Sequence, residues 1–248
     1  MSLDSIISEA IAQLKGEHVS APCCPAQKSK FASCLEHSVV NPDMSADKIL
    51  KACEEAKKYG AANVVVSPYF VKDAAAALKG SGVGIDVIIG FPHAASTTAG
   101  KVADIRESVK NGATELDLSI CVNALKSKRY DEVMMDLLAM KEAAGEGILL
   151  KIIYEQVFMN EEEKKIALLL AQKCGIPFVK ISNNFSDRKA CVEDIRFVKS
   201  VVGDSMKIKI DGGIRTVDKG MELLAAGASR LGVSATVALA EEALKRGL

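Results

Sequence analysis

Short apolar runs alternate along the chain with longer segments in which apolar residues recur at helical spacing. The short runs predict eight buried strands, at residues 32–40, 62–67, 85–90, 114–119, 148–154, 177–182, 206–211 and 229–233. Each interval between two runs holds one helix candidate. Eight strand–helix units within 248 residues favour an α/β fold with a single closed (β/α)8 barrel (TIM barrel), and an open doubly wound sheet is the second interpretation.

The predicted helices begin at capping residues and end at glycines. Ser45 is suited to cap a helix over 45–59, and Gly60 is suited to end it. The helices expected at 161–174 and 217–226 follow the same pattern, with a polar residue before each and a glycine after it. The intervals therefore read as helices joined to the strands by short loops.

The N-terminal segment differs from the repeating unit. Residues 3–15 place Leu3, Ile6, Ile7, Ala10, Ile11 and Leu14 in helical register, and residues 18–30 are polar and contain proline. We therefore expect an extra N-terminal helix and loop over 1–30 and one barrel domain over 31–248.

Composition excludes several classes of function. The 32 basic and 32 acidic residues cancel, which argues against a nucleic-acid partner. No apolar run approaches the length of a membrane span, and the N-terminus lacks a signal-peptide pattern, so we expect a cytoplasmic protein without a membrane partner. The seven cysteines have no C-x-x-C spacing, which favours reduced core thiols over disulfides or a zinc site.

Polar residues recur on one face of several predicted strands. Because strand side chains alternate, Asp117 shares a face with Glu115 and Ser119, opposite Leu116 and Leu118. Similar alternation puts three lysines on the polar faces of their strands, namely Lys151, Lys180 and Lys209. Helices cover the outside of a barrel, so these polar faces should point into its interior. One interpretation is a salt-bridge network that fills the barrel, and the other is a catalytic site.

Three of these residues fit Schiff-base chemistry. A lysine becomes a nucleophile when it loses its proton, and both burial and a second cation favour that loss. Lys180 and Lys209 lie on consecutive predicted strands, so we expect Lys209 to help lower the pKa of Lys180. Asp117 could relay protons with Lys209 and a water molecule. We therefore predict Lys180, Lys209 and Asp117 as catalytic residues, with no metal and no organic cofactor.

Two glycine-containing turns predict a phosphate site. Gly212, Gly213 and Arg215 follow the seventh predicted strand, and Gly232 and Ser234 follow the eighth. In such barrels, the loops after these strands often hold a phosphate through backbone amides and a helix N-terminus. Two adjacent glycines let the backbone approach an anion closely, although they are also typical of a plain tight turn.

The three histidines give no metal or catalytic-triad pattern. His18, His37 and His93 are scattered along the chain. We interpret each as structural.

Eight stretches of this chain resemble the deoxyribose-phosphate aldolase family in order and spacing, over roughly residues 32–240. They are Leu35-Glu36-His37-Ser38 with Pro42, Val66-Ser67-Pro68-Tyr69, Ile89-Gly90-Phe91-Pro92, Glu115-Leu116-Asp117, Leu150-Lys151-Ile152-Ile153-Tyr154-Glu155, Phe178-Val179-Lys180, Lys209-Ile210-Asp211-Gly212-Gly213-Ile214-Arg215-Thr216, and Gly227-Ala228-Ser229-Arg230-Leu231-Gly232. The resemblance implies that Lys180 forms the Schiff base, Lys209 perturbs it and Asp117 relays protons. It also implies reversible cleavage of 2-deoxyribose 5-phosphate to glyceraldehyde 3-phosphate and acetaldehyde, without a cofactor.

The chain departs from the family pattern next to the expected substrate. The family usually has Asp-His-Thr where this chain has Glu36-His37-Ser38, and Thr-Ser-Thr-Gly where it has Ile181-Ser182-Asn183-Asn184. Before the paired glycines, Asp211 replaces a serine. We include Asn183 and Asp211 among the substrate-binding candidates, because asparagine and aspartate can bind hydroxyl groups.

Three hypotheses for the function remain open. The first is a deoxyribose-phosphate aldolase acting on a small phosphorylated sugar or aldehyde. The second is a related Schiff-base aldolase with another sugar or sugar-phosphate substrate, which the altered residues favour. The third is a non-catalytic barrel that acts as a binding partner, which the complete set of Lys180, Lys209 and Asp117 disfavours. A homodimer is the default assembly for such barrels.

Overall fold

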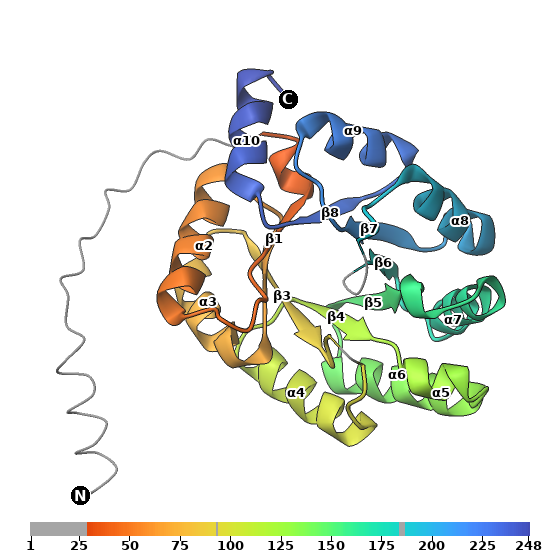
Figure 1. The fold of residues 1–248 in the computed structure, drawn as a ribbon. Coiled ribbons are helices and arrows are strands. Elements are labelled where there is room, and N and C mark those ends of the chain that lie inside the picture. Colours follow the sequence, from red (N-terminus) through yellow and green to blue (C-terminus); the bar gives the residue numbers. More distant parts are fainter. Residues whose placement is uncertain (1–28, 93, 184–186) are drawn as a thin grey trace, which may run out of the picture.

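Eight parallel strands close into a barrel, with β1 paired to both β2 and β8. The structure is a computed structural model and describes residues 29–92, 94–183 and 187–248. The strands surround the barrel axis in chain order (Figure 1). They are β1 Leu35–Ser38, β2 Asn63–Val66, β3 Gly84–Ile89, β4 Glu115–Ser119, β5 Leu149–Glu155, β6 Phe178–Ser182, β7 Lys207–Asp211 and β8 Arg230–Val233. Each overlaps one predicted strand, so the (β/α)8 prediction is confirmed and the open sheet is excluded.

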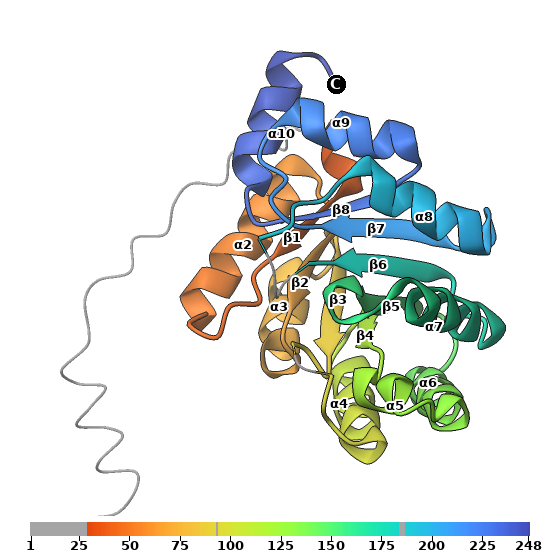
Figure 2. The same ribbon diagram turned by 45° about the vertical axis from the view of Figure 1, so that its right-hand side comes forward.

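The helices form a layer outside the strands, as the two views in Figures 1 and 2 show. They are α2 Ala46–Tyr59, α3 Val71–Leu78, α4 Thr98–Lys110, α5 Val122–Lys126, α6 Tyr130–Ala144, α7 Glu161–Lys173, α8 Val192–Val202, α9 Val217–Ala226 and α10 Thr236–Lys245. Short 3-10 helices lie at Ala32–Cys34, Pro68–Phe70 and Gln156–Phe158. The prediction of one helix per interval is wrong between β4 and β5, where α5 and α6 follow one another.

The capping residues act as predicted. The Ser45 side chain accepts a hydrogen bond from the Lys48 amide at the start of α2, and Gly60 ends that helix in the left-handed conformation. Asn160 and Glu163 form a reciprocal capping box at the start of α7. These bonds satisfy backbone groups that a helix end leaves without partners.

The two faces of each strand have opposite character. Leu116 and Leu118 of β4, and Ile208 and Ile210 of β7, belong to the buried apolar cluster between the strands and the helices. Their neighbours point the other way, into the barrel, which places carboxylates and ammonium groups there. The predicted alternation is therefore confirmed, and this barrel has a charged interior where branched apolar side chains are more usual.

Some predictions lie wholly or partly outside the described residues. They include the helix at 3–15, most of the loop at 18–30, His93 and Asn184. The division into residues 1–30 and 31–248 therefore stays a prediction. Within the described part of the chain, Cys34, Cys53, Cys121, Cys174 and Cys191 form no disulfides. The same part contains no helix with the length and apolar character needed to cross a bilayer.

Candidate active site

Lys180 lies between two carboxylates inside the barrel. It occupies the middle of β6, and its side chain is only 5% exposed. Its Nζ lies 3.0 Å from Asp117 Oδ2 and 3.2 Å from Asp211 Oδ2. The ring of Phe91, from the loop after β3, has its centroid 5.7 Å from the same nitrogen. One buried amine is thus in contact with two acids and shielded by an aromatic ring.

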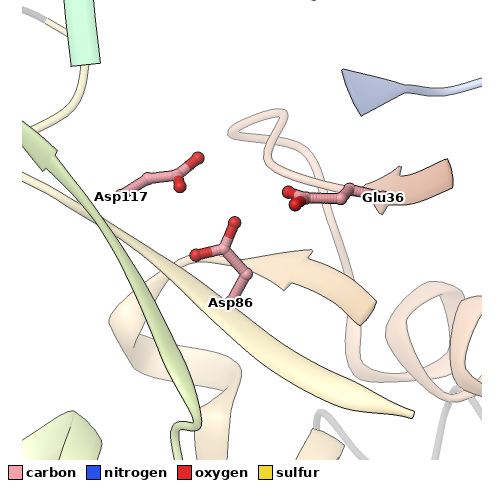
Figure 3. Close-up of side chains that lie close together, drawn as sticks. All are labelled: Glu36, Asp86 and Asp117. Carbon is pink, nitrogen blue, oxygen red and sulfur yellow. The ribbon is translucent and has the colours of Figure 1, made fainter. Parts of the chain in front are cut away.

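Lys209 lies beside Lys180 in the sheet, as predicted, because the two residues are paired in the β6–β7 register. Its Nζ lies 2.7 Å from Asp117 Oδ2 and 2.8 Å from Asp86 Oδ2, and it also contacts Glu36. Figure 3 shows that these three carboxyl groups point toward one another from β1, β3 and β4. Their oxygens are close enough together to hold a metal ion, but the Lys209 ammonium group already lies among them.

Lys151 completes the network at its centre. Its Nζ lies 2.6 Å from Glu115 Oε2, 3.0 Å from Asp86 Oδ2, 3.3 Å from Asp117 Oδ1 and 3.7 Å from Glu36 Oε1. We refer to the buried set as the barrel charge cluster, and it consists of Glu36, Asp86, Glu115, Asp117, Lys151, Lys180 and Lys209. Pairing of this kind offsets the large cost of taking isolated charges out of water.

The cluster fixes the protonation of its members. Burial would raise the pKa of Asp117, but Lys180, Lys209 and Lys151 together hold it well below its usual range. Burial would lower the pKa of Lys209, but Asp117, Asp86 and Glu36 hold it well above its usual range. Asp86 behaves differently, because burial and the neighbouring Asp117 carboxylate raise its pKa to about 6. Asp86 therefore gains a proton more readily than Asp117 does near neutral pH.

The prediction of a lowered pKa for Lys180 is wrong for the free enzyme. Burial and Lys209 do act in that direction, but Asp117 and Asp211 outweigh them, so the pKa of Lys180 is raised. The sequence indicated that Lys209 lies near Lys180, but it did not indicate how close Asp117 and Asp211 lie to the Lys180 amine. Lys180 therefore rests as an ammonium group and must lose a proton before it can act as a nucleophile.

The predicted phosphate residues lie in the loops after β7 and β8. Gly212 and Gly213 have φ angles of 119° and 69°, which favour glycine. Arg215 Nη1 donates a hydrogen bond to Ser234 Oγ at 3.0 Å, which ties the two loops together. Both side chains are exposed, and Thr216 caps the following helix, α9. The loops thus offer backbone amides without Cβ atoms at Gly212 and Gly213, the N-terminus of α9 and the Arg215 guanidinium at one end of the barrel.

Two of the residues that depart from the family pattern, Asn183 and Asp211, are held by neighbouring residues. Asn183 is buried, and its Oδ1 accepts a hydrogen bond from Gln156 Nε2 at 2.9 Å. Asp211 packs against Gly232, where a Cβ atom would lie only 2.8 Å from the Asp211 Cβ. The missing side chain at Gly232 leaves the space that Asp211 needs. Asp211 is thereby held against Lys180, and the structure does not direct it toward Arg215.

Sequence reasoning missed several members of the site. Glu36 and Glu115 appeared in the family stretches without a role, and Asp86 and Phe91 received none either. Asp86 did carry a signal, because it is a charged residue inside an otherwise apolar strand. The structural interpretation of His37 stays consistent with its geometry. Its Nδ1 lies 2.7 Å from Thr236 Oγ1 and its Nε2 3.1 Å from Glu55 Oε2, among the helices.

Known proteins with similar sequences are aldolases. Residues 32–236 match the sequence model of the DeoC/LacD family aldolases. The deoxyribose-phosphate aldolase of Staphylococcus carnosus is 42% identical over 84% of this chain and 94% of its own length. That of Streptococcus sanguinis is 43% identical over 85% of this chain and 95% of its own length.

Solved structures agree with this result. An aldolase named QR15 superposes with a TM-score of 0.83 at 32% identity, covering 88% of this chain and 97% of its own. A tetrameric deoxyribose phosphate aldolase from Aeropyrum pernix has a TM-score of 0.79 at 22% identity, over 87% of this chain and 91% of its own, and this likeness supports the fold. The extent and identity of these matches show that the chain belongs to the DeoC/LacD family of aldolases, which are carbon–carbon lyases.

Proposed function

We propose that this aldolase cleaves 2-deoxyribose 5-phosphate reversibly to glyceraldehyde 3-phosphate and acetaldehyde, through a Schiff base on Lys180. The observation that supports this most directly is the buried Lys180 amine between Asp117 and Asp211, in a chain that is over 40% identical to named deoxyribose-phosphate aldolases. Burial excludes water from the amine, and the two carboxylates can accept its protons.

The proposed reaction begins at the aldehyde carbon of the open-chain sugar. Lys180, once deprotonated, attacks this carbon, and the resulting carbinolamine loses water to form an iminium ion. A base then takes the proton of the C3 hydroxyl, the C2–C3 bond breaks, and its electron pair is delocalised into the iminium as an enamine. Protonation of the enamine at C2 and hydrolysis release acetaldehyde and restore the Lys180 amine. Asp117, 3.0 Å from this amine, is positioned to move protons in these steps.

We place the phosphate group at the loops after β7 and β8. Gly212 and Gly213 can present backbone amides to an anion without the obstruction of a Cβ atom. Arg215, Ser234 and the N-terminus of α9 can add positive charge and hydrogen-bond donors. Gly232 and Asn183 border the same end of the barrel, beside Asp211 and Gly212 respectively.

A related aldolase with a different sugar substrate is the second candidate. It is favoured by Asp211, because a carboxylate near the phosphate loops repels an anion and can accept a hydrogen bond from a hydroxyl. A retro-aldol assay with a panel of deoxy sugar phosphates and the matching free sugars distinguishes the two. We expect cleavage of 2-deoxyribose 5-phosphate, and cleavage of only another sugar would contradict the first candidate.

The nucleophile is tested separately by trapping. Borohydride reduction in the presence of substrate should give one covalent adduct, which peptide mapping places on Lys180. An adduct on Lys151 or Lys209 would overturn the assignment. Asp117→Asn, which keeps the size of the side chain, should remove most of the activity while circular dichroism shows an intact fold.

We also propose that the enzyme is cytoplasmic and works as a homodimer on a soluble sugar phosphate. Closed symmetric dimers are the most common assembly among soluble homo-oligomers, although the relative from Aeropyrum pernix is described as tetrameric. Sedimentation of the purified protein measures the assembly directly, and fractionation of cells measures the location.

A further inference from the structure

The raised pKa of Lys180 means that its proton needs an acceptor that does not take part in the later steps. The amine must lose a proton before it attacks, yet Asp117 and Asp211 both stabilise its ammonium form. If Asp117 kept that proton, it would no longer be a base for the later steps. A second acceptor, connected to Asp117 but away from the reacting carbon, would solve this difficulty.

An unbroken chain of polar contacts leads from Lys180 to such an acceptor. Lys180 Nζ lies 3.0 Å from Asp117 Oδ2. The same oxygen accepts a hydrogen bond from Lys209 Nζ at 2.7 Å, and Lys209 Nζ also donates to Asp86 Oδ2 at 2.8 Å. Three short contacts therefore join the reacting nitrogen to Asp86, which is fully buried in the middle of β3.

We propose that Asp86 is a positioning residue that stores the proton of Lys180 during imine formation, through the relay Lys180–Asp117–Lys209–Asp86. This inference rests on the proposed Schiff-base function. It gives a role to a carboxylate that does not contact Lys180 directly.

The proton balance of the relay is complete. Lys180 gives a proton to Asp117 Oδ2, Lys209 gives one to Asp86 Oδ2, and the Asp117 proton then passes to the neutral Lys209. The net change is a neutral Lys180 amine and a protonated Asp86, with Asp117 and Lys209 in their starting forms. When the carbinolamine hydroxyl leaves, the relay runs backward and this proton departs with the hydroxyl as water.

The surroundings of Asp86 suit this role. The charged groups around it come from the other strands of the barrel: Glu36 from β1, Glu115 and Asp117 from β4, Lys151 from β5 and Lys209 from β7. Arg230 of β8 lies further away, with its Nε 3.6 Å from Glu36 Oε1. Asp117 and Glu36 favour a proton on Asp86, whereas Lys151, 3.0 Å away, and Lys209 favour its charged form. Burial and Asp117 bring the pKa of Asp86 to about 6, so both forms are within reach near neutral pH.

Asp86→Asn tests the proposal, because an amide of the same size cannot store the proton. The rate of imine formation is measured in single turnover by borohydride quenching, across a range of pH, with circular dichroism as the check on folding. We expect Asp86→Asn to slow imine formation at neutral pH by about tenfold or more. Asp136→Asn is the matched control, since it changes another buried aspartate that contacts a lysine, Lys101 at 2.6 Å, but lies outside the barrel charge cluster, and its rate should stay near that of the wild type.

A purely electrostatic role for Asp86 predicts the opposite result. Asp86 helps to raise the pKa of Lys180, so its neutralisation alone would make the amine easier to deprotonate. Imine formation in Asp86→Asn that is equally fast or faster at neutral pH would overturn the relay while leaving the Schiff-base function intact. A wild-type enzyme that forms no adduct on Lys180 would overturn both.

Wild-type protein provides an independent measurement if Asp86→Asn does not fold. Time-resolved infrared spectra with carboxyl-labelled aspartate should show a protonated aspartate that appears after mixing with substrate and decays as the imine forms. Spectra with no such transient band would overturn the proposal.

Discussion

Asp211 Oδ2 lies 3.2 Å from Nζ of Lys180, which also contacts the deeply buried Asp117 at 3.0 Å. Asp211 is the more exposed of the two carboxylates, with 19% of its side chain accessible, so we expect an entering substrate to meet it first. In the proposed imine on Lys180, the carboxyl group of Asp211 would lie close to the substrate. The residue therefore influences both the amine and the substrate-binding side of the barrel.

Replacement of Asp211 by serine should shift the pH dependence of catalysis. Asp211 raises the pKa of Lys180, so its removal should move the acid limb of the activity profile to lower pH, by about one unit. Phosphorylated substrates should also gain a lower apparent KM, because one negative charge is gone. Asp204→Ser, at a fully exposed loop position, is the control and should change neither quantity. An unchanged pH–activity profile in Asp211→Ser would show that Asp211 does not raise the pKa of Lys180.

Lys209→Leu should reduce both stability and activity at neutral pH. The substitution removes one of the two cations, Lys209 and Lys151, that contact Glu36, Asp86 and Asp117 together. Loss of one partner from a buried ion pair typically costs about 3–5 kcal/mol. The pKa of Lys180 should rise further, which moves activity to higher pH. Urea unfolding and pH–rate profiles measure the two effects.

The control for this prediction lies on the same strand. Lys207 begins β7, and its side chain is exposed, so Lys207→Leu should leave stability and the pH profile nearly unchanged. Equal stability of Lys209→Leu and wild-type protein would show that the three carboxylates do not need this cation.

Asp86→Asn should change how stability depends on pH. The pKa of Asp86 rises from 3.8 in the unfolded chain to about 6 in the fold, so between these values the folded protein binds more protons. The stability from this group is fully present below pH 3.8 and is lost as pH rises through about 6. Asparagine does not titrate, so it has no such loss. Between pH 3.8 and about 6 the free energy of unfolding of the variant should therefore rise relative to that of the wild type, by up to about 3 kcal/mol. Urea unfolding of both proteins at acidic and neutral pH measures this gain. A difference in unfolding free energy between variant and wild type that is the same at both pH values would refute the prediction.

Thr236→Val should destabilise the fold without affecting the charge cluster. The hydroxyl of Thr236 contacts buried His37 Nδ1 at 2.7 Å, and valine of similar shape leaves that nitrogen without its partner. The free energy of unfolding should fall by about 1–3 kcal/mol, as thermal or urea denaturation can measure. Thr236→Ser keeps the hydroxyl and should recover most of the loss. If valine and serine behaved alike, the hydrogen bond would contribute nothing measurable.

The barrel could be predicted because its signals are local. Each strand is a short apolar run, and Ser45, Asn160 and Thr216 mark helix starts by bonds to amides three residues away. The break between α5 and α6 was missed because it has no glycine or proline. It lies near Lys128, a non-glycine residue with a φ of 56°.

The site was predictable only in part, for a related physical reason. Alternation along single strands identified the inward lysines and Asp117, since it needs no knowledge of other strands. The partnership of Asp86 with Lys209 joins residues 123 positions apart, and nothing within β3 or β7 specifies it. The pKa of Lys180 depends on the balance between Lys209, Asp117 and Asp211, and that balance is set by distances across the barrel.

The contact between Asp211 and Gly232 restricts the order in which these positions can change. A Cβ at position 232 would lie 2.8 Å from the Cβ of Asp211 and 3.5 Å from Cε of Lys209. The 2.8 Å separation is shorter than the contacts that real Cβ atoms make. Every residue except glycine has a Cβ atom at position 211, so replacing Asp211 by another residue would not remove this clash. Libraries that diversify residue 232 alone should therefore yield mostly inactive or misfolded protein. Variation at position 211 with Gly232 kept is the accessible route to altered substrate preference.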